Sequence, residues 1–465
     1  MARTAITTGA LLVAFSCVGR AAAQTPPPAE TPGAAAPVAP AEAPAPESAP
    51  PPPAPTPPTV QTFEPADVTG PKGGEPVPVS TTPAKTALNA LPLTMDEMPV
   101  AASNNRVTLN LFGDTALAIN SAGPAGLDGF LPASPHRPAF LIGDLDLLIT
   151  GRAANLTAMA ETALEQHGGG DVGIDLERIF VGWRGERVSL DAGRTHAELG
   201  YWNNAFHHGR WLQIPTGRPE VLKFEDEGGI LPVHQVGVSA HWRAYVDGDQ
   251  QIELVGSVGN GRGDFTDDVL ETDETNVFKA LLFKVGWKGF GARDLQFGVS
   301  GLYDRIAPVA GLSADPTAFV RPALPGQTIN ESIGNAYLAY RGVDLTLIAE
   351  AFDVLHSAAM PDAAGSTSWN TFDAYALGAY RIGQVSPYLM TELRHTSTDP
   401  DPFFFPNPAA TTTVFLRDFY EETVGWRWDF TTWSAIKVEY RLVLLRDPGS
   451  SSTMHVGTID WCFGL

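Results

Sequence analysis

From residue 106 onward, apolar and polar residues alternate along the chain. Val107, Leu109 and Leu111 are separated by Thr108 and Asn110, and the same period of two recurs up to the C-terminus. Successive side chains of a β-strand point to opposite faces, so this period predicts strands with one apolar and one polar face. We therefore predict that residues 105–465 form one all-β domain.

Segments with this alternation are joined by connections that are short and long in turn. We predict strands at 106–119, 138–150, 154–165, 174–184, 187–195, 234–246, 251–259, 276–289, 294–305, 331–341, 343–354, 371–382, 385–397, 418–430, 433–446 and 454–465. The short connections are 151–153, 185–186, 247–250, 290–292, around 342, 383–384 and 431–432. The long ones are 120–137, 166–173, 196–233, 260–275, 306–330, 355–370, 398–417 and 447–453. Short turns at one rim and long loops at the other are typical of outer-membrane barrels.

The predicted strands are long enough to cross a membrane. Several match the roughly 9 to 11 residues that a tilted spanning strand needs, whereas nothing after residue 23 approaches the ~20 apolar residues of a membrane helix. A soluble β-sandwich would not explain the regular alternation of connection lengths. The predicted fold class is therefore all-β, a closed antiparallel transmembrane β-barrel of about 16 strands, preceded by a disordered Pro/Ala-rich arm.

Residues 1–23 have the parts of a secretory signal peptide. Arg3 precedes an apolar run, and Ala21, Ala22 and Ala23 offer a small-residue cleavage site. A lipoprotein signal with acylated Cys17 is the alternative.

Residues 24–104 are rich in Pro and Ala and almost lack aromatic residues. Such a segment cannot bury enough apolar surface to offset the entropy of ordering. We predict a disordered periplasmic arm.

The overall charge excludes one class of partner. The chain has 465 residues and a net charge of −22, with 30 basic and 52 acidic residues, so we expect no nucleic-acid partner. The acidic excess predicts a mild cation preference for any pore. The two cysteines are Cys17, in the signal, and Cys462, so the mature chain must be stable without an internal disulfide.

Two segments carry a family resemblance. Residues 459–465 have apolar residues at every second position, like the terminal strand by which Gram-negative outer-membrane proteins are recognised by the barrel-assembly machinery, although Leu465 replaces the usual final aromatic residue. In residues 191–201, Gly193 and Arg194 precede Gly200, which resembles the point where many porins leave the barrel wall and enter a long loop. The chain thus resembles the sixteen-stranded porin superfamily over residues 106–465. It is distantly similar to phosphate- and carbohydrate-type porins, with Glu198 where these commonly have proline.

This resemblance implies a location and surroundings for the protein. It implies a homotrimer in the Gram-negative outer membrane, in contact with lipid and lipopolysaccharide, with the arm in the periplasm. It also implies that the longest loop, after the fifth strand, narrows the channel.

That loop, residues 196–233, carries charges of both signs at and beyond its entrance. Opposed charges across a narrow, partly desolvated lumen would orient and select polar solutes or ions. Alternatively, they pair with one another and pin the loop to the wall. The candidate constriction residues are Arg194, His196, Glu198, Arg210, Arg218, Lys223, Glu225 and Asp226.

The alternation also predicts which wall side chains point into the lumen. The candidate wall residues are Arg178, Asp191, His241, Arg243, Arg427, Lys437, Glu439 and Arg441.

Two further kinds of loop residue suggest chemistry. The histidines match no structural metal template, and we predict neither a metal nor a cofactor. Trp202, Phe206 and Trp211 would either stack against sugars or anchor the loop to the wall.

No catalytic motif supports an enzyme. The chain lacks a Gly-x-Ser-x-Gly elbow, a His-Glu-x-x-His helix and a glycine-rich phosphate loop. The predicted function is passive diffusion of small hydrophilic solutes through a water-filled channel. The alternatives are a structural or adhesive barrel with a plugged lumen, and a substrate-specific sugar or anion channel.

Overall fold

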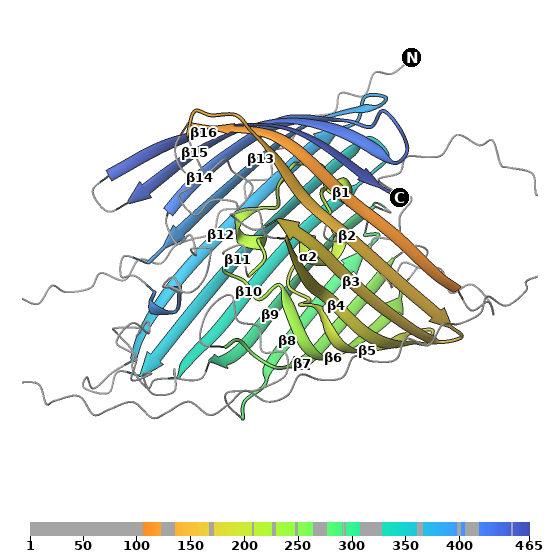
Figure 1. The fold of residues 1–465 in the computed structure, drawn as a ribbon. Helices are drawn as coiled ribbons and strands as arrows, with labels where there is room; N and C mark the ends of the chain where they lie inside the picture. The colour runs from red at the N-terminus through yellow and green to blue at the C-terminus, as the bar shows by residue number, and fades with distance from the viewer. Residues whose placement is uncertain are drawn as a thin grey trace, which may run out of the picture. The chain divides into compact units, whose positions relative to one another are not determined.

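The computed structural model describes the barrel region with gaps. The described residues are 106–121, 135–166, 172–206, 209–225, 229–246, 250–263, 277–290, 292, 294–306, 328–359, 366–397, 401–404, 418–447 and 450–465. The predicted signal peptide and arm lie outside them. Within them, sixteen strands form one closed barrel (Figure 1). The predicted fold class of the barrel region is confirmed.

Each strand overlaps the range predicted for it. The strands are β1 (Arg106–Asn120), β2 (Ala139–Ala153), β3 (Leu156–Gln166), β4 (Val172–Arg184), β5 (Val188–His196), β6 (His234–Tyr245), β7 (Gln251–Gly259), β8 (Ala280–Lys288), β9 (Leu295–Ile306), β10 (Ile329–Arg341), β11 (Leu345–Ala359), β12 (Ser366–Tyr380), β13 (Val385–Thr396), β14 (Asp418–Trp428), β15 (Ser434–Asp447) and β16 (Ser450–Gly464). Sequence neighbours pair antiparallel. The first and last strands also pair, with Leu117 opposite Ile459, so no sheet edge is left open.

The two faces of the wall differ sharply. Leu109 and Ile149 are opposite each other on β1 and β2 and are both exposed, whereas Asp146 on the other face of β2 is fully buried. Each of the sixteen strands presents at least one large exposed apolar side chain. An apolar band of this extent is far larger than the patches soluble monomers tolerate. The outer face therefore requires an apolar environment.

The main apolar core lies inside the barrel. It joins residues between β5 and β6, such as Trp202 and Leu222, to inward side chains of β8 through β13, such as Phe352 and Tyr375. The polar lumen expected of a barrel is thus interrupted by an apolar sector on this side. Among the described residues, no helix has the length and apolarity to span a membrane.

Two predicted long loops are wrong. Residues 355–370 are mostly strand, because β11 continues to Ala359 and β12 begins at Ser366. Residues 447–453 are also mostly strand, since Asp447 of β15 is paired with Ser450 of β16. Most residues of these two segments are small or polar, so the apolar alternation is lost. Backbone hydrogen bonding between strands does not require that alternation.

Candidate functional site

The connection between β5 and β6, residues 197–233, lies inside the barrel, and we call it the inward loop. It contains three short helical turns, α2 (Trp202–Ala205), η2 (Arg210–Leu212) and η3 (Glu220–Leu222). Figure 1 shows α2 enclosed by the strands. The loop contacts both β1, where Asp114 is 3.4 Å from Arg210, and β11, where Glu350 binds its backbone. It therefore crosses the lumen.

Glu350 holds the start of α2. Its two carboxylate oxygens accept hydrogen bonds of 2.8 Å from the backbone N–H groups of Tyr201 and Trp202. Tyr375 donates its hydroxyl and Asn335 its side-chain amide to the same carboxylate. The first N–H groups of a helical turn have no partner within the turn, so a buried carboxylate is well suited to bind them.

Two more wall carboxylates bind the loop in the same way. Glu392 on β13 accepts the N–H groups of Glu220 and Val221, at 2.8 and 3.0 Å, where η3 begins. Glu439 on β15 accepts the N–H of Thr216 at 2.9 Å. The anchoring carboxylates therefore stand on alternate strands, β11, β13 and β15.

Two wall cations bind the loop's carbonyl oxygens. Arg427 on β14 donates from Nη1 to the carbonyls of Trp211 and Gln213, at 2.6 and 2.7 Å. Lys437 on β15 donates from Nζ to the carbonyls of Arg210 and Pro215, at 2.5 and 2.9 Å. Charge-assisted hydrogen bonds are roughly twice as strong as neutral ones. Wall side chains thus bind both the N–H groups and the carbonyl groups of the loop's main chain.

The aromatic residues of the loop act as apolar anchors. Trp202 is fully buried and packs on Phe206, with ring centroids 4.5 Å apart, and on Tyr375 of β12 at 5.7 Å. Trp211 is buried beneath Arg427, whose Cζ lies 4.6 Å from the indole ring. Buried rings cannot stack against a passing sugar, so the structure favours anchoring.

The basic constriction candidates Arg194 and Arg218 bind backbone carbonyls. Arg194 donates from Nε to the carbonyl of Glu177 at 2.9 Å. Arg218 donates from Nε to the carbonyl of Leu222 at 2.7 Å, and its Cζ lies 4.2 Å from the Phe224 ring centroid. Both side chains therefore stabilise the local chain path.

Two other basic candidates form ion pairs. Lys223 contacts Glu220 at 2.9 Å, and Arg210 contacts Asp114 as described above. Neither cation faces the lumen as an isolated charge.

The remaining candidates also have partners. His196 is buried, with Nδ1 2.8 Å from the carbonyl of Asn203. Glu198 accepts a hydrogen bond of 2.9 Å from Lys284 on β8. Asp226 lies outside the described residues.

Glu225 closes the far end of the loop. Its carboxylate accepts the backbone N–H of His234 at 2.8 Å and lies 3.0 Å from Nδ1 of that ring. Burial would raise the pKa of Glu225, but the charge and hydrogen bonds of His234 outweigh it and lower the pKa below its usual value. Glu225 is therefore a structural anion at the junction with β6.

The predicted wall residues on β4 to β6 face inward, but they pair within the wall. Arg178 forms an ion pair with Glu161, Asp191 lies 2.7 Å from Arg184, and Arg243 lies 3.1 Å from Glu253.

On β6 and β15 the remaining wall residues contact acidic groups. His241 is buried with Nε2 3.8 Å from Asp191, and Arg441 lies 3.6 Å from Glu439. Arg427, Lys437 and Glu439 bind the loop, as described above.

Sequence reasoning missed a buried cluster near the end of β11. His356 is fully buried between Asp401, 2.7 Å from Nδ1, and Glu331, 3.0 Å from Nε2. Arg262 approaches Glu331 at 3.4 Å and donates to the carbonyl of Ile230 in the inward loop at 2.6 Å. The segment containing His356 was predicted to be a loop because it lacks the alternation of apolar and polar residues. No sequence pattern therefore indicated that His356 points into the barrel.

The described residues contain no group of three or more His, Cys, Asp or Glu arranged to hold a metal ion. His196 and His234 are neighbours, with ring centroids 5.2 Å apart. His207 and His208 lie outside the described residues.

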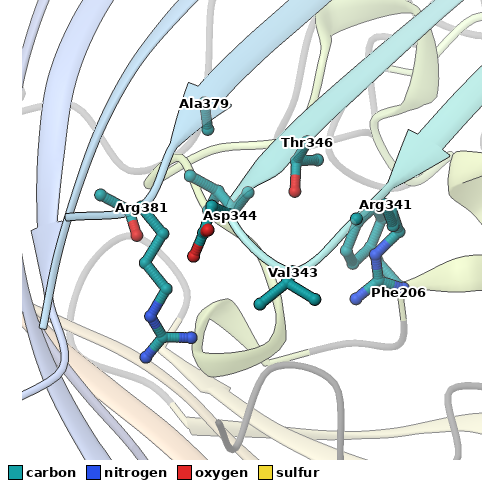
Figure 2. A pocket seen from close by; sticks show the side chains of 10 residues that line it. Phe206, Arg341, Val343, Asp344, Thr346, Ala379 and Arg381 are labelled. Atoms are coloured by element: carbon teal, nitrogen blue, oxygen red, sulfur yellow. The ribbon is translucent and has the colours of Figure 1, made fainter. Parts of the chain in front are cut away.

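A pocket opens at the rim that carries the short turns (Figure 2). The inward loop contributes Phe206 and Ile214 to it. The ends of β10 to β13 and the turns between them contribute the rest, including Arg341 at the end of β10 and Arg381 in the β12–β13 turn. The pocket thus brings residues of the inward loop together with residues of the wall.

No protein-family model matches the sequence, and no curated protein matches it. Solved structures of bacterial outer-membrane proteins are similar in fold. An anion-selective porin from Comamonas acidovorans is 12% identical with a TM-score of 0.48, over 78% of this chain and 100% of that chain. The trimer form of Vibrio cholerae OmpT is 10% identical with a TM-score of 0.48, over 78% and 100%. Salmonella typhi OmpF is 13% identical with a TM-score of 0.47, over 77% and 98%.

Proposed function

We propose that the protein is an outer-membrane channel that lets small hydrophilic solutes diffuse passively beside the inward loop. The observation that carries this proposal is a loop fastened across the lumen of a closed barrel whose outer face is apolar. An apolar outer band fits a bilayer, and a polar inner wall fits a water-filled path. The chain would act without catalysis.

The orientation follows from the connections. The rim of short turns would face the periplasm and the rim of long loops the outside, as in other barrels of this kind. The homotrimer implied by the sequence resemblance is part of the proposal.

A plugged barrel is the second candidate. Its support is the burial of wall charges that bind the loop, because Arg427 and Lys437 are both fully inaccessible. In that case the barrel would serve as a structural or adhesive support, and the loop would close the lumen rather than narrow it.

Conductance in planar bilayers separates these candidates. A channel gives an open, nearly ohmic current from the full chain, and deletion of residues 203–226 enlarges the current. A plugged barrel gives no current until that deletion is made. Heat-modifiable migration on gels checks in each case that the barrel has folded. A folded full chain without current would overturn the channel, and an unchanged current after the deletion would overturn the constriction.

A further inference from the structure

Residues 401–404, in the connection between β13 and β14, pack into the apolar core inside the barrel. They include the short turn η4 (Pro402–Phe404). Phe403 and Phe404 are buried and belong to the same core cluster as Leu231 of the inward loop. Their ring centroids lie 5.1 and 5.0 Å from that of His356 on β11. Because His356 points into the barrel, this segment enters the barrel as well.

His356 binds two carboxylates at once. Its Nδ1 lies 2.7 Å from Oδ2 of Asp401, and its Nε2 lies 3.0 Å from Oε1 of Glu331 on β10. An ionised carboxylate can only accept hydrogen bonds, and a neutral imidazole has one N–H to donate. Both contacts are hydrogen bonds only when the ring carries a proton on each nitrogen. In that form His356 is a cation that attaches residues 401–404 to the wall.

Arg262, in the connection after β7, is the second cation of this cluster. Its Nε lies 3.4 Å from Glu331, and its Nη2 donates to the carbonyl of Ile230 at 2.6 Å. Its backbone N–H donates to the carboxylate of Asp304 on β9 at 2.9 Å. Glu331 therefore has a cationic partner besides His356, and that partner is fastened to the wall and to the inward loop.

Asp401 depends more strongly on His356. It also accepts the N–H of Phe403 at 3.0 Å, but that bond lies within the segment and does not attach it to the wall. On β12 the residue opposite His356 is Trp369, which carries no charge. Within the described part of the cluster, the hydrogen bond from His356 is thus the charge-assisted contact that holds Asp401 in the barrel.

Loss of the His356 proton should weaken this attachment. One ring nitrogen would then turn a lone pair toward a carboxylate oxygen, and a buried carboxylate that loses its donor is destabilised. Glu331 lies in a barrel strand and keeps Arg262, whereas Asp401 lies in a connection and can move into water. Release of residues 401–404 is therefore the response that costs less free energy.

We propose that residues 401–404 form a pH-sensitive latch, which narrows the mouth of the lumen beside the inward loop while His356 is protonated and leaves it when the proton is lost. The effect on the lumen rests on the proposed channel function. The latch itself is a property of the fold, so it can be tested whether or not the barrel conducts.

Limited digestion of the full chain with chymotrypsin in an uncharged detergent tests the latch. Chymotrypsin cleaves after aromatic residues, and Phe403 and Phe404 are buried while the latch is closed. Mass spectrometry of the fragments gives the rate of cleavage at these two sites. At neutral pH we expect about tenfold faster cleavage there in Asp401→Asn, which corresponds to the loss of one charge-assisted contact.

His395→Gln is the matched control. His395 also contacts an aspartate, with Nδ1 3.0 Å from Asp418, but its side chain is exposed. This variant should be cleaved at Phe403 and Phe404 at the original rate. In His356→Gln, cleavage at neutral pH should be faster than in the original chain. That difference should shrink as the pH is raised into the alkaline range, because the original chain then loses the His356 proton as well.

Equal cleavage of Asp401→Asn and His395→Gln, with both barrels folded by heat-modifiable migration, would overturn the latch. A difference between His356→Gln and the original chain that does not change with pH would overturn its control by the proton. The Asp401 comparison alters no strand residue, so it holds if His356→Gln fails to fold.

Conductance in planar bilayers tests the effect on the lumen separately. Asp401→Asn should give a larger current than the original chain. An unchanged current in a conducting barrel would overturn the narrowing of the mouth. No current from either chain would overturn the proposed channel, whereas faster cleavage of Asp401→Asn would still support the latch.

Discussion

Replacing Glu350 with glutamine should release the start of α2 while the barrel stays folded. The carboxylate binds the N–H groups of Tyr201 and Trp202, each at 2.8 Å, as well as the side chains of Tyr375 and Asn335. Glutamine has nearly the same shape, but it offers one acceptor oxygen and turns an NH₂ group toward a donor.

The expected loss can be worked from these contacts. A hydrogen bond to a charged group contributes about 1.5–3 kcal/mol, and an unsatisfied buried N–H costs about 1–3 kcal/mol. One of the two backbone N–H groups would lose its hydrogen-bond acceptor. The other would bind a neutral amide oxygen in place of a charged carboxylate oxygen. We expect the free energy of local opening to fall by about 3 kcal/mol, or roughly 100-fold in protection from exchange.

Hydrogen exchange followed by mass spectrometry measures this directly. Peptides covering residues 200–206 should exchange faster in Glu350→Gln, while peptides from β10 to β12 should keep their protection. Glu186→Gln is the control, since Glu186 is exposed on the β4–β5 turn. Unchanged protection of residues 200–206 in a folded Glu350→Gln barrel would refute the anchoring role of this carboxylate.

Three other predictions follow from buried groups. Gly200→Ala should speed the exchange of the same amides, because φ at Gly200 is +74° and a Cβ would lie 2.1 Å from the Glu350 carboxylate; Gly256→Ala, with open space around its Cβ, should not. Because folding lowers the pKa of Glu225, its carboxylate stabilises the folded state fully above the ordinary pKa of 4.5, and this stabilisation is lost as the pH falls through the folded-state pKa. The thermal unfolding temperature at low pH should therefore depend less on pH in Glu225→Gln. In a chain with Cys17→Ser, the fully buried thiol of Cys462 should react with Ellman's reagent only after unfolding, and rapid labelling of the folded barrel would contradict its burial.

The strands were predictable because the two sides of the wall face different surroundings. That difference makes apolar and polar residues alternate along each strand, as at Leu109 and Asn110. The alternation can be recognised in the sequence without knowing which strands pair. Where the wall continues beyond the apolar band, as at His356 and Ser450, the period disappears and the prediction fails.

The candidate site was predictable in position but not in detail. The longest loop and many inward charges could be read from the sequence, yet a residue type does not reveal its partner. Glu198 pairs with Lys284 across 86 positions, and Arg427 reaches Trp211 across 216. Such pairs depend on strand register and on the path of the loop, neither of which leaves a local pattern. For this reason no sequence pattern indicated that Glu350 anchors the loop.

The attachment of the inward loop has a consequence for how this barrel can change. Glu350, Glu392, Glu439, Arg427 and Lys437 all bind main-chain atoms, which every loop sequence of the same backbone shape possesses. Loop side chains that do not pack into the core can therefore vary without detaching the loop. The wall side chains therefore fix the path of the loop independently of its sequence, so evolution or design could change the exposed loop residues while the attachment stays the same.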